Sequence, residues 1–125
     1  MSRVQVTPRR LNTREESIIR KLLSVDFPGV EEFVSQISHT QVVATWGKGS
    51  QSLDFRVLPE VPKGPAADGE LPVFGEVADA NGTITGFITL WVKDGLLNAL
   101  EYGSHTDDSP ASLPDLPAVS VSRFK

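Results

Sequence analysis

Residues 73–102 read VFGEVADANGTITGFITLWVKDGLLNALEY, and this stretch decides the fold class. The dipeptides Asn81-Gly82 and Asp94-Gly95 divide it, and both are strong signals for tight hairpin turns. Between the two turns, Thr83–Lys93 is rich in β-branched and aromatic residues, which favour strands. The segments on either side alternate between apolar and polar residues. We therefore predict three antiparallel strands joined as a meander.

Two more strands are expected upstream of the meander. Thr40–Trp46 and Gln51–Leu58 carry strand-forming residues on either side of the turn signal Gly47–Ser50, so they predict a hairpin. The proline-rich segment Pro59–Pro72 then predicts a long loop, and loops of this length are often mobile or functional. Near the end of the chain, Val119–Phe124 is interpreted as a short edge strand or an ordered tail.

Two helices are expected before the strands. Residues 13–24 have one apolar stripe, and Asn12 with Glu15 forms the pattern of a capping box. Residues 30–38 place apolar side chains on one face of a second, shorter helix, after an elbow at Asp26–Gly29. Helices followed by strands predict an α+β fold, with two N-terminal helices packed on one face of a mainly antiparallel sheet of about five strands.

The 125 residues suit a single domain. Within it we expect a flexible basic arm over residues 1–11 and a proline-rich C-terminal segment over residues 104–125. The longest apolar stretch, Gly86–Val92, is far shorter than the roughly 20 residues that a membrane helix needs. No signal-peptide pattern begins the chain. A cytoplasmic protein that does not enter membranes is the expectation.

The formal net charge of −4 is unevenly distributed. Residues 1–25 contain six basic and two acidic residues, whereas residues 26–125 contain six basic and fourteen acidic residues. No aromatic residue lies among the N-terminal basic residues to stack on nucleobases, and the acidic remainder would repel phosphate. We therefore expect no nucleic-acid binding.

Few residues are available for catalysis or metal binding. The chain has no cysteine and two histidines, which excludes thiolate metal sites and cysteine nucleophiles. One histidine lies next to carboxylates, in His105-Thr106-Asp107-Asp108, and this segment has the composition of a solvated turn. We predict no metal site, no cofactor and no catalytic residue.

A binding surface is the more economical interpretation of the strand residues. The predicted strand Thr83–Lys93 has apolar residues on both of its faces. This indicates that the strand is buried on both faces, or that one face meets a partner. Acidic residues near the strand ends would complement a basic protein. The predicted partner-binding residues are Trp91 in first place, with Phe87, Glu76, Glu101 and His105.

Three segments also carry a resemblance. Leu11–Glu16, the elbow Asp26–Gly29 and the return Val92–Tyr102 resemble small uncharacterised bacterial proteins, mostly actinobacterial, of α+β fold. The resemblance extends over about residues 11–117 and implies no activity. Small acidic α+β proteins of this size also include immunity proteins that neutralise a toxin, which is a similarity of class.

Two alternatives to a protein-binding module stay open. The first is a small-molecule-binding domain or minor enzyme, with a pocket between helices and sheet that the 59–72 loop gates. Its polar groups would be His39, Glu76, Glu101 and His105. The second is a homodimer that pairs its sheet faces or edges and binds no ligand.

Overall fold

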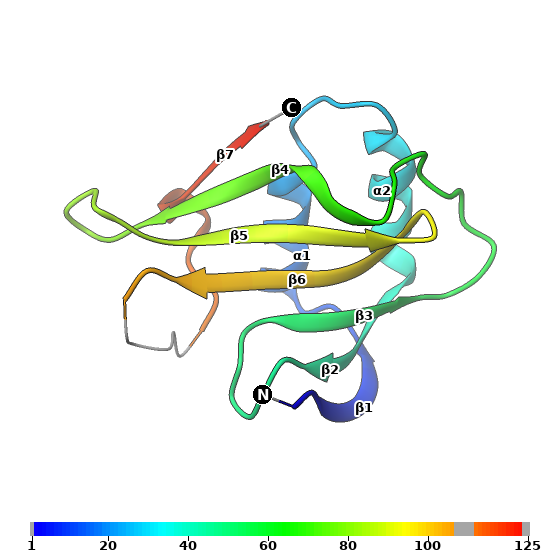
Figure 1. Ribbon diagram of the computed structural model, residues 1–125, viewed down its shortest axis with the longest axis horizontal. Helices are drawn as coiled ribbons and strands as arrows, with labels where there is room; N and C mark the ends of the chain where they lie inside the picture. The colour runs from blue at the N-terminus through cyan, green and yellow to red at the C-terminus, as the bar shows by residue number, and fades with distance from the viewer. Residues whose placement is uncertain (1, 107–111, 124–125) are drawn as a thin grey trace.

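The computed structural model describes residues 2–106 and 112–123, which form one antiparallel sheet and two short helices (Figure 1). The sheet has seven strands in the order β1-β2-β3-β6-β5-β4-β7, so the first and last strands of the chain form its two edges. The strands are β1 Val4–Arg10, β2 Thr40–Thr45, β3 Leu53–Val57, β4 Gly69–Ala78, β5 Ile84–Lys93, β6 Leu96–Ser104 and β7 Val119–Arg123.

Helix α1 spans Thr13–Leu22 and starts at the predicted capping box. The Asn12 side chain accepts a hydrogen bond from the Glu15 amide, and the Glu15 carboxylate accepts one from the Asn12 amide, so two otherwise free amides are satisfied. Helix α2 spans Val30–Gln36 and continues into a 3₁₀ turn, η1, at Ile37–His39. A second 3₁₀ turn, η2 at Leu116–Ala118, precedes β7.

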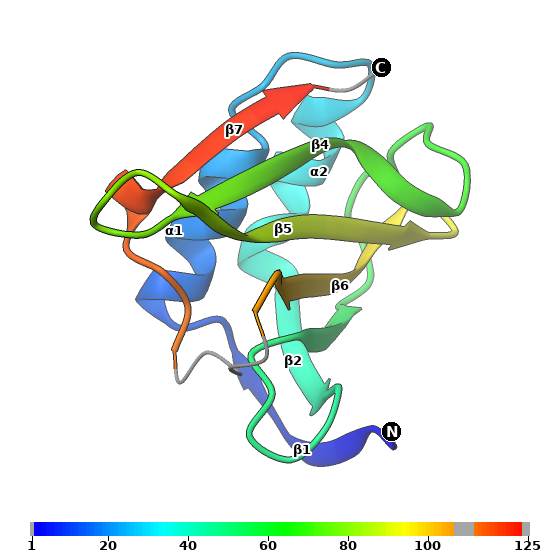
Figure 2. The same ribbon diagram turned by 60° about the vertical axis from the view of Figure 1, so that its left-hand side comes forward.

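Both helices lie against one face of the sheet, and Figure 2 shows them behind β4, β5 and β6. The core lies between these two layers. Fully or almost fully buried apolar side chains come from the helices (Ile18, Ile19, Leu22, Phe33, Ile37) and from the sheet (Leu71, Val73, Ile88, Leu90, Leu97, Leu100).

The α+β class and the antiparallel sheet are therefore as predicted, but the sheet has two more strands than the expected five. One addition is β7, which pairs with β4 and makes Val119–Arg123 of the expected Val119–Phe124 segment an edge strand. Phe124 lies outside the described residues. The other addition is β1, which pairs with β2 where we expected an irregular basic arm over residues 1–11. Pro8 and three arginines make this segment a poor interior strand, but an edge strand tolerates both residue types.

The meander forms as predicted, and its second turn shows why. Asp94 and Gly95 both have positive φ, at 54° and 78°, as a two-residue turn between antiparallel strands requires. Strands β4, β5 and β6 are consequently neighbours in the sheet.

The loop predicted over residues 59–72 ends earlier than expected, because residues 69–72 belong to β4, and the remainder is bonded to the rest of the molecule. The fully buried side chain of Gln36 donates to the carbonyls of Pro62 and Gly95, and it accepts from the Leu97 amide. The loop also donates from the Gly64 amide to the Gly95 carbonyl. These hydrogen bonds attach the loop to α2 and to the turn between β5 and β6.

Within the described part of the chain, no helix has the length and apolar character needed to cross a membrane.

Candidate binding face

The side chains of β5 alternate between the two faces of the sheet. Ile88 and Leu90 are fully buried beneath the helices, whereas Phe87 and Trp91 project from the opposite side and are partly buried. We call this opposite side the open face; it is the side seen in Figure 1, with both helices behind it.

Cross-strand pairing determines which residues share the open face, because directly paired residues project to the same side. Three rows cross the middle of the sheet. The first contains Glu70, Trp91, Ala99 and Asp54, the second Phe74, Thr89 and Glu101, and the third Glu76, Phe87 and Gly103.

The open face therefore brings together the predicted residues Trp91, Phe87, Glu76 and Glu101. The fifth, His105, follows β6 and lies against Phe87, with 5.9 Å between ring centroids. Residues that are far apart in sequence thus become neighbours through strand pairing.

Trp91 and Glu101 form a bonded pair in the middle of this face. The indole Nε1 of Trp91 donates to Oε1 of Glu101 over 3.1 Å. The indole N–H fixes the orientation of the carboxylate and leaves Oε2 of Glu101 available. Among the described residues, no lysine or arginine lies within ion-pairing distance of this carboxylate.

Phe87 lies across the backbone of β6 at Gly103. A Cβ atom built on Gly103 would lie closer to the Phe87 ring than any real side chain permits, so only glycine leaves space for the ring here. The ring thus covers a strand position without a side chain of its own and stands beside His105.

Thr89 stands between Phe74 and Glu101 in the second row. It is 6% exposed, and its hydroxyl has no hydrogen-bond partner. A buried hydroxyl without a partner costs about 1–3 kcal/mol. The open face therefore holds one polar atom whose hydrogen-bonding capacity is unused.

A second tryptophan–carboxylate pair lies on the same face near the β1 edge. The indole Nε1 of Trp46 donates to Oδ1 of Asp54 over 2.9 Å. Here a cation completes the group, because Arg3 Nε lies 3.0 Å from Oδ2 of Asp54. The guanidinium carbon of Arg3 also lies 4.4 Å from the centre of the Trp46 ring, which is a cation–π contact.

The open face carries charges of both signs, and its carboxylates gather on the middle strands β4 and β6. Three of its carboxylates, Glu70, Glu76 and Glu101, form no ion pair with any residue that the structure describes. The cations on this side lie toward its margins. Arg3 is paired with Asp54, and Arg56 donates to the Gln41 side chain. Arg10 lies opposite Gln41 on β1, and Lys93 is the last residue of β5.

The residues expected to line a pocket between helices and sheet are not gathered there. His39 is exposed at the end of η1, whereas Glu76, Glu101 and His105 belong to the open face. The space between the layers is filled by the core side chains.

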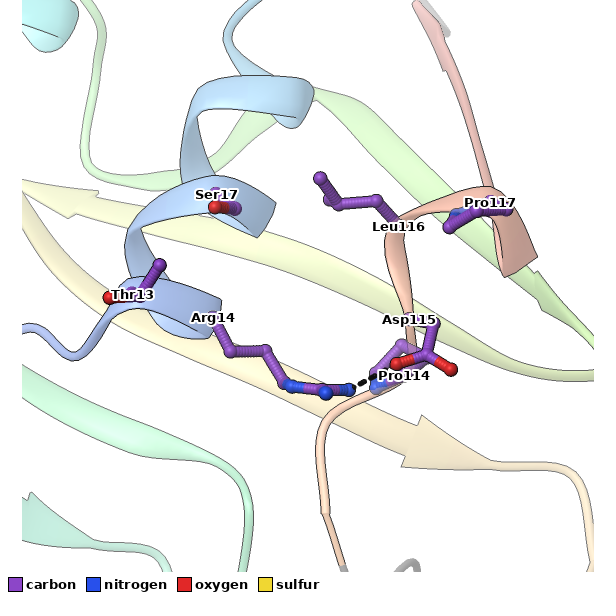
Figure 3. Close-up of a pocket in the computed structure, with 7 residues that line it drawn as sticks. All are labelled: Thr13, Arg14, Ser17, Pro114, Asp115, Leu116 and Pro117. Carbon is purple, nitrogen blue, oxygen red and sulfur yellow. Dashed lines mark hydrogen bonds and ion pairs between the residues drawn. The ribbon is translucent and has the colours of Figure 1, made fainter.

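A cleft lies elsewhere, between α1 and η2 (Figure 3). Its volume is about 560 Å³. Arg14 reaches across it to Oδ1 of Asp115 at 2.7 Å and to the Leu113 carbonyl at 3.0 Å. These bonds tie the C-terminal segment to α1, and none of the predicted binding residues is present. Its lining residues are Thr13, Arg14, Ser17, Pro114, Asp115, Leu116 and Pro117.

The described residues contain no group of three or more histidine, aspartate or glutamate side chains arranged to hold a metal ion. In the expected turn at residues 105–108, His105 and Thr106 are exposed, and Asp107 and Asp108 lie outside the described residues.

Strand alternation places Thr89 on the same face as Phe87 and Trp91, but nothing in the sequence indicates that its hydroxyl is unpartnered. The Arg3–Trp46–Asp54 group was not predicted. Trp46 and Phe74 were recognisable as strand aromatics, but such residues usually belong to a core. Arg3 and Asp54 are 51 positions apart, and no local pattern predicts their pairing.

Comparisons with models of protein families, with curated protein sequences and with solved structures give no match to this chain.

Proposed function

We propose that this protein is a non-enzymatic binding protein whose open face binds a basic segment of another protein. The observation that carries the proposal is the combination of Trp91, Phe87 and Phe74 with three carboxylates that no described cation pairs. Aromatic side chains supply contact area at low entropic cost, and unpaired carboxylates select for a positively charged partner.

The position of the two helices supports the same proposal, because neither covers this side. Both helices contact the other face, which leaves a largely continuous aromatic and acidic surface on the middle strands. Surfaces of this kind on a small protein commonly mark interaction sites.

The experiment is a two-dimensional NMR titration of the isotope-labelled protein with short peptides of opposite charge. We expect a peptide that alternates glycine with a basic residue to shift amide signals of β4, β5 and β6. The effect should weaken as salt is raised, because exposed charges are screened beyond roughly 10 Å at 0.1 M salt. A matched peptide with glutamate in place of the basic residue should shift none of them.

Glu76→Gln removes one unpaired charge from the face, and Glu31→Gln removes one from the exposed side of α2. The first variant should weaken binding of the basic peptide, and the second should not. Equal effects of both variants, or shifts confined to the helices, would contradict the proposal.

A further inference from the structure

We propose that Trp91, Glu101 and Thr89 form a receptor for an arginine guanidinium supplied by the partner protein. This inference rests on the proposed function and specifies the chemical group that the open face recognises.

The two tryptophan–carboxylate pairs of the open face have the same hydrogen bonding. In each, the indole N–H donates to one carboxylate oxygen, over 2.9 Å at Trp46–Asp54 and 3.1 Å at Trp91–Glu101. The second carboxylate oxygen is left for another donor. At Asp54 that donor is the guanidinium of Arg3, which also lies over the indole ring.

The Trp91–Glu101 pair lacks only the arginine. Among the described residues, no cation lies over the Trp91 ring, and none pairs with Glu101. The chain thus displays at Trp46 the occupied form of a group whose second copy is open to a partner.

The two pairs are also related by their position in the sheet. Asp54 and Trp91 flank Ala99 in one cross-strand row, which separates them by two strand spacings, or about 10 Å. Both pairs therefore face the same side, and a partner lying on the open face would meet the Trp91–Glu101 pair.

Thr89 supplies an independent observation that points to a hydrogen-bond donor. Its hydroxyl is the one buried side-chain polar atom without a partner among the described residues, and Thr89 is paired directly with Glu101. A hydroxyl oxygen can accept a hydrogen bond, so one N–H group of a bound guanidinium would satisfy it once the side chains around Thr89 shift to admit it.

Guanidinium fits these three groups better than the ammonium of lysine. It is planar and stacks on an indole ring, and its five donors in a rigid fork reach a carboxylate and a hydroxyl at the same time. Lysine would offer a single point charge without the stacking plane.

The test compares two short peptides, one alternating glycine with arginine and the other alternating glycine with lysine. Binding is followed by calorimetry and by the two indole N–H signals in NMR, since the chain has two tryptophans. We expect the arginine peptide to bind more tightly and to move the Trp91 indole signal more than that of Trp46.

Two variants examine the receptor itself. Glu101→Gln keeps an acceptor for the indole but removes the charge, and it should lower the affinity for the arginine peptide about tenfold. Thr89→Val keeps the shape and removes the unused hydroxyl, so it should weaken arginine binding about threefold while leaving the protein equally or more resistant to urea. A purely structural role for Thr89 would leave peptide affinity unchanged.

The outcomes separate this inference from the proposed function. If the lysine and arginine peptides bind the open face equally well and neither variant changes affinity, the guanidinium receptor is refuted and the basic-partner proposal stands. If neither peptide perturbs β4, β5 or β6, the proposed function is refuted together with the receptor.

Discussion

Glu15 caps the first helix and also bonds that helix to the first strand. Its carboxylate is almost completely buried and accepts two hydrogen bonds from Arg9 of β1, at 2.9 and 2.8 Å, in addition to the Asn12 amide. The side-chain hydrogen bonds to Glu15 raise the pKa of Arg9 above its ordinary value. The capping box was predicted from local spacing, but the link to β1 is tertiary.

Replacing this side chain tests that double role. We expect Glu15→Ala to lower the free energy of unfolding by about 2–3 kcal/mol, because a helix cap and two charge-assisted hydrogen bonds are lost together. Urea unfolding measures the change. Glu16→Ala is the matched control, since Glu16 forms only an exposed ion pair with Arg20 and should cost less than about 0.5 kcal/mol. Equal losses in the two variants would show that the buried link contributes nothing.

Tyr102 gives a prediction at alkaline pH. Burial raises its pKa above the ordinary value of 10.0, because the charged phenolate loses solvation. The stabilising contribution of the neutral phenol is fully present below the unfolded-state pKa, and it disappears as the pH rises through the higher folded-state pKa.

As the single tyrosine of the chain, Tyr102 can be titrated directly by tyrosinate absorbance. We expect a higher midpoint in the folded protein than in the protein unfolded in guanidinium chloride, and no such transition in Tyr102→Phe. Identical midpoints in folded and unfolded protein would contradict this account.

At the scale of elements, Gln36 joins a helix, a loop and a turn. The sequence places it on the polar face of the second helix, yet the structure buries it completely with three hydrogen bonds. Helical periodicity could not reveal this, because the loop that covers Gln36 folds back from 26 residues further along the chain.

We expect Gln36→Leu to cost about 2–4 kcal/mol of unfolding free energy, since it leaves the buried Leu97 amide without a partner and removes the side-chain bonds to the Pro62 and Gly95 carbonyls. Hydrogen exchange should accelerate at the Leu97 amide, which donates to the Gln36 side chain. Ser35→Ala, on the exposed side of the same helix, serves as the control and should change neither quantity appreciably. Unchanged exchange at Leu97 would refute the anchoring role.

A comparison of the edge strands with the interior strands shows which elements local sequence patterns can predict. The interior strands β2 to β6 could be predicted because turn signals and runs of β-branched residues are visible in their sequence. Strand β1 has neither, because its pairing with β2 depends on a chain reversal through both helices. The position of β1 at the edge of the sheet explains its proline and arginines, because both residue types hinder pairing of an edge strand with another chain.

At the scale of the whole molecule, the distribution of charge bears on self-association. A symmetric dimer through the open face would bring Glu70, Glu76 and Glu101 of one copy toward the same carboxylates of the other, and like charges across an interface are unfavourable. We therefore expect a monomer of 13.6 kDa by light scattering at low salt and high micromolar concentration. A mass of twice that value, reduced to the monomer by Trp91→Ala, would assign the open face to a second copy of the chain.

The sequence by itself determined the α+β class, the meander, the capped first helix and the residues Trp91, Phe87, Glu76, Glu101 and His105 as candidates. Each of these follows from short-range chemistry: turn residues with positive φ, alternation along a strand, and a cap three positions from its partner. The tertiary structure alone decided that these candidates share one face, and that Thr89 lies unpartnered among them. It also decided that Arg3 completes the Trp46–Asp54 pair. These facts depend on strand order and register, which are fixed when the core residues of distant segments are buried together.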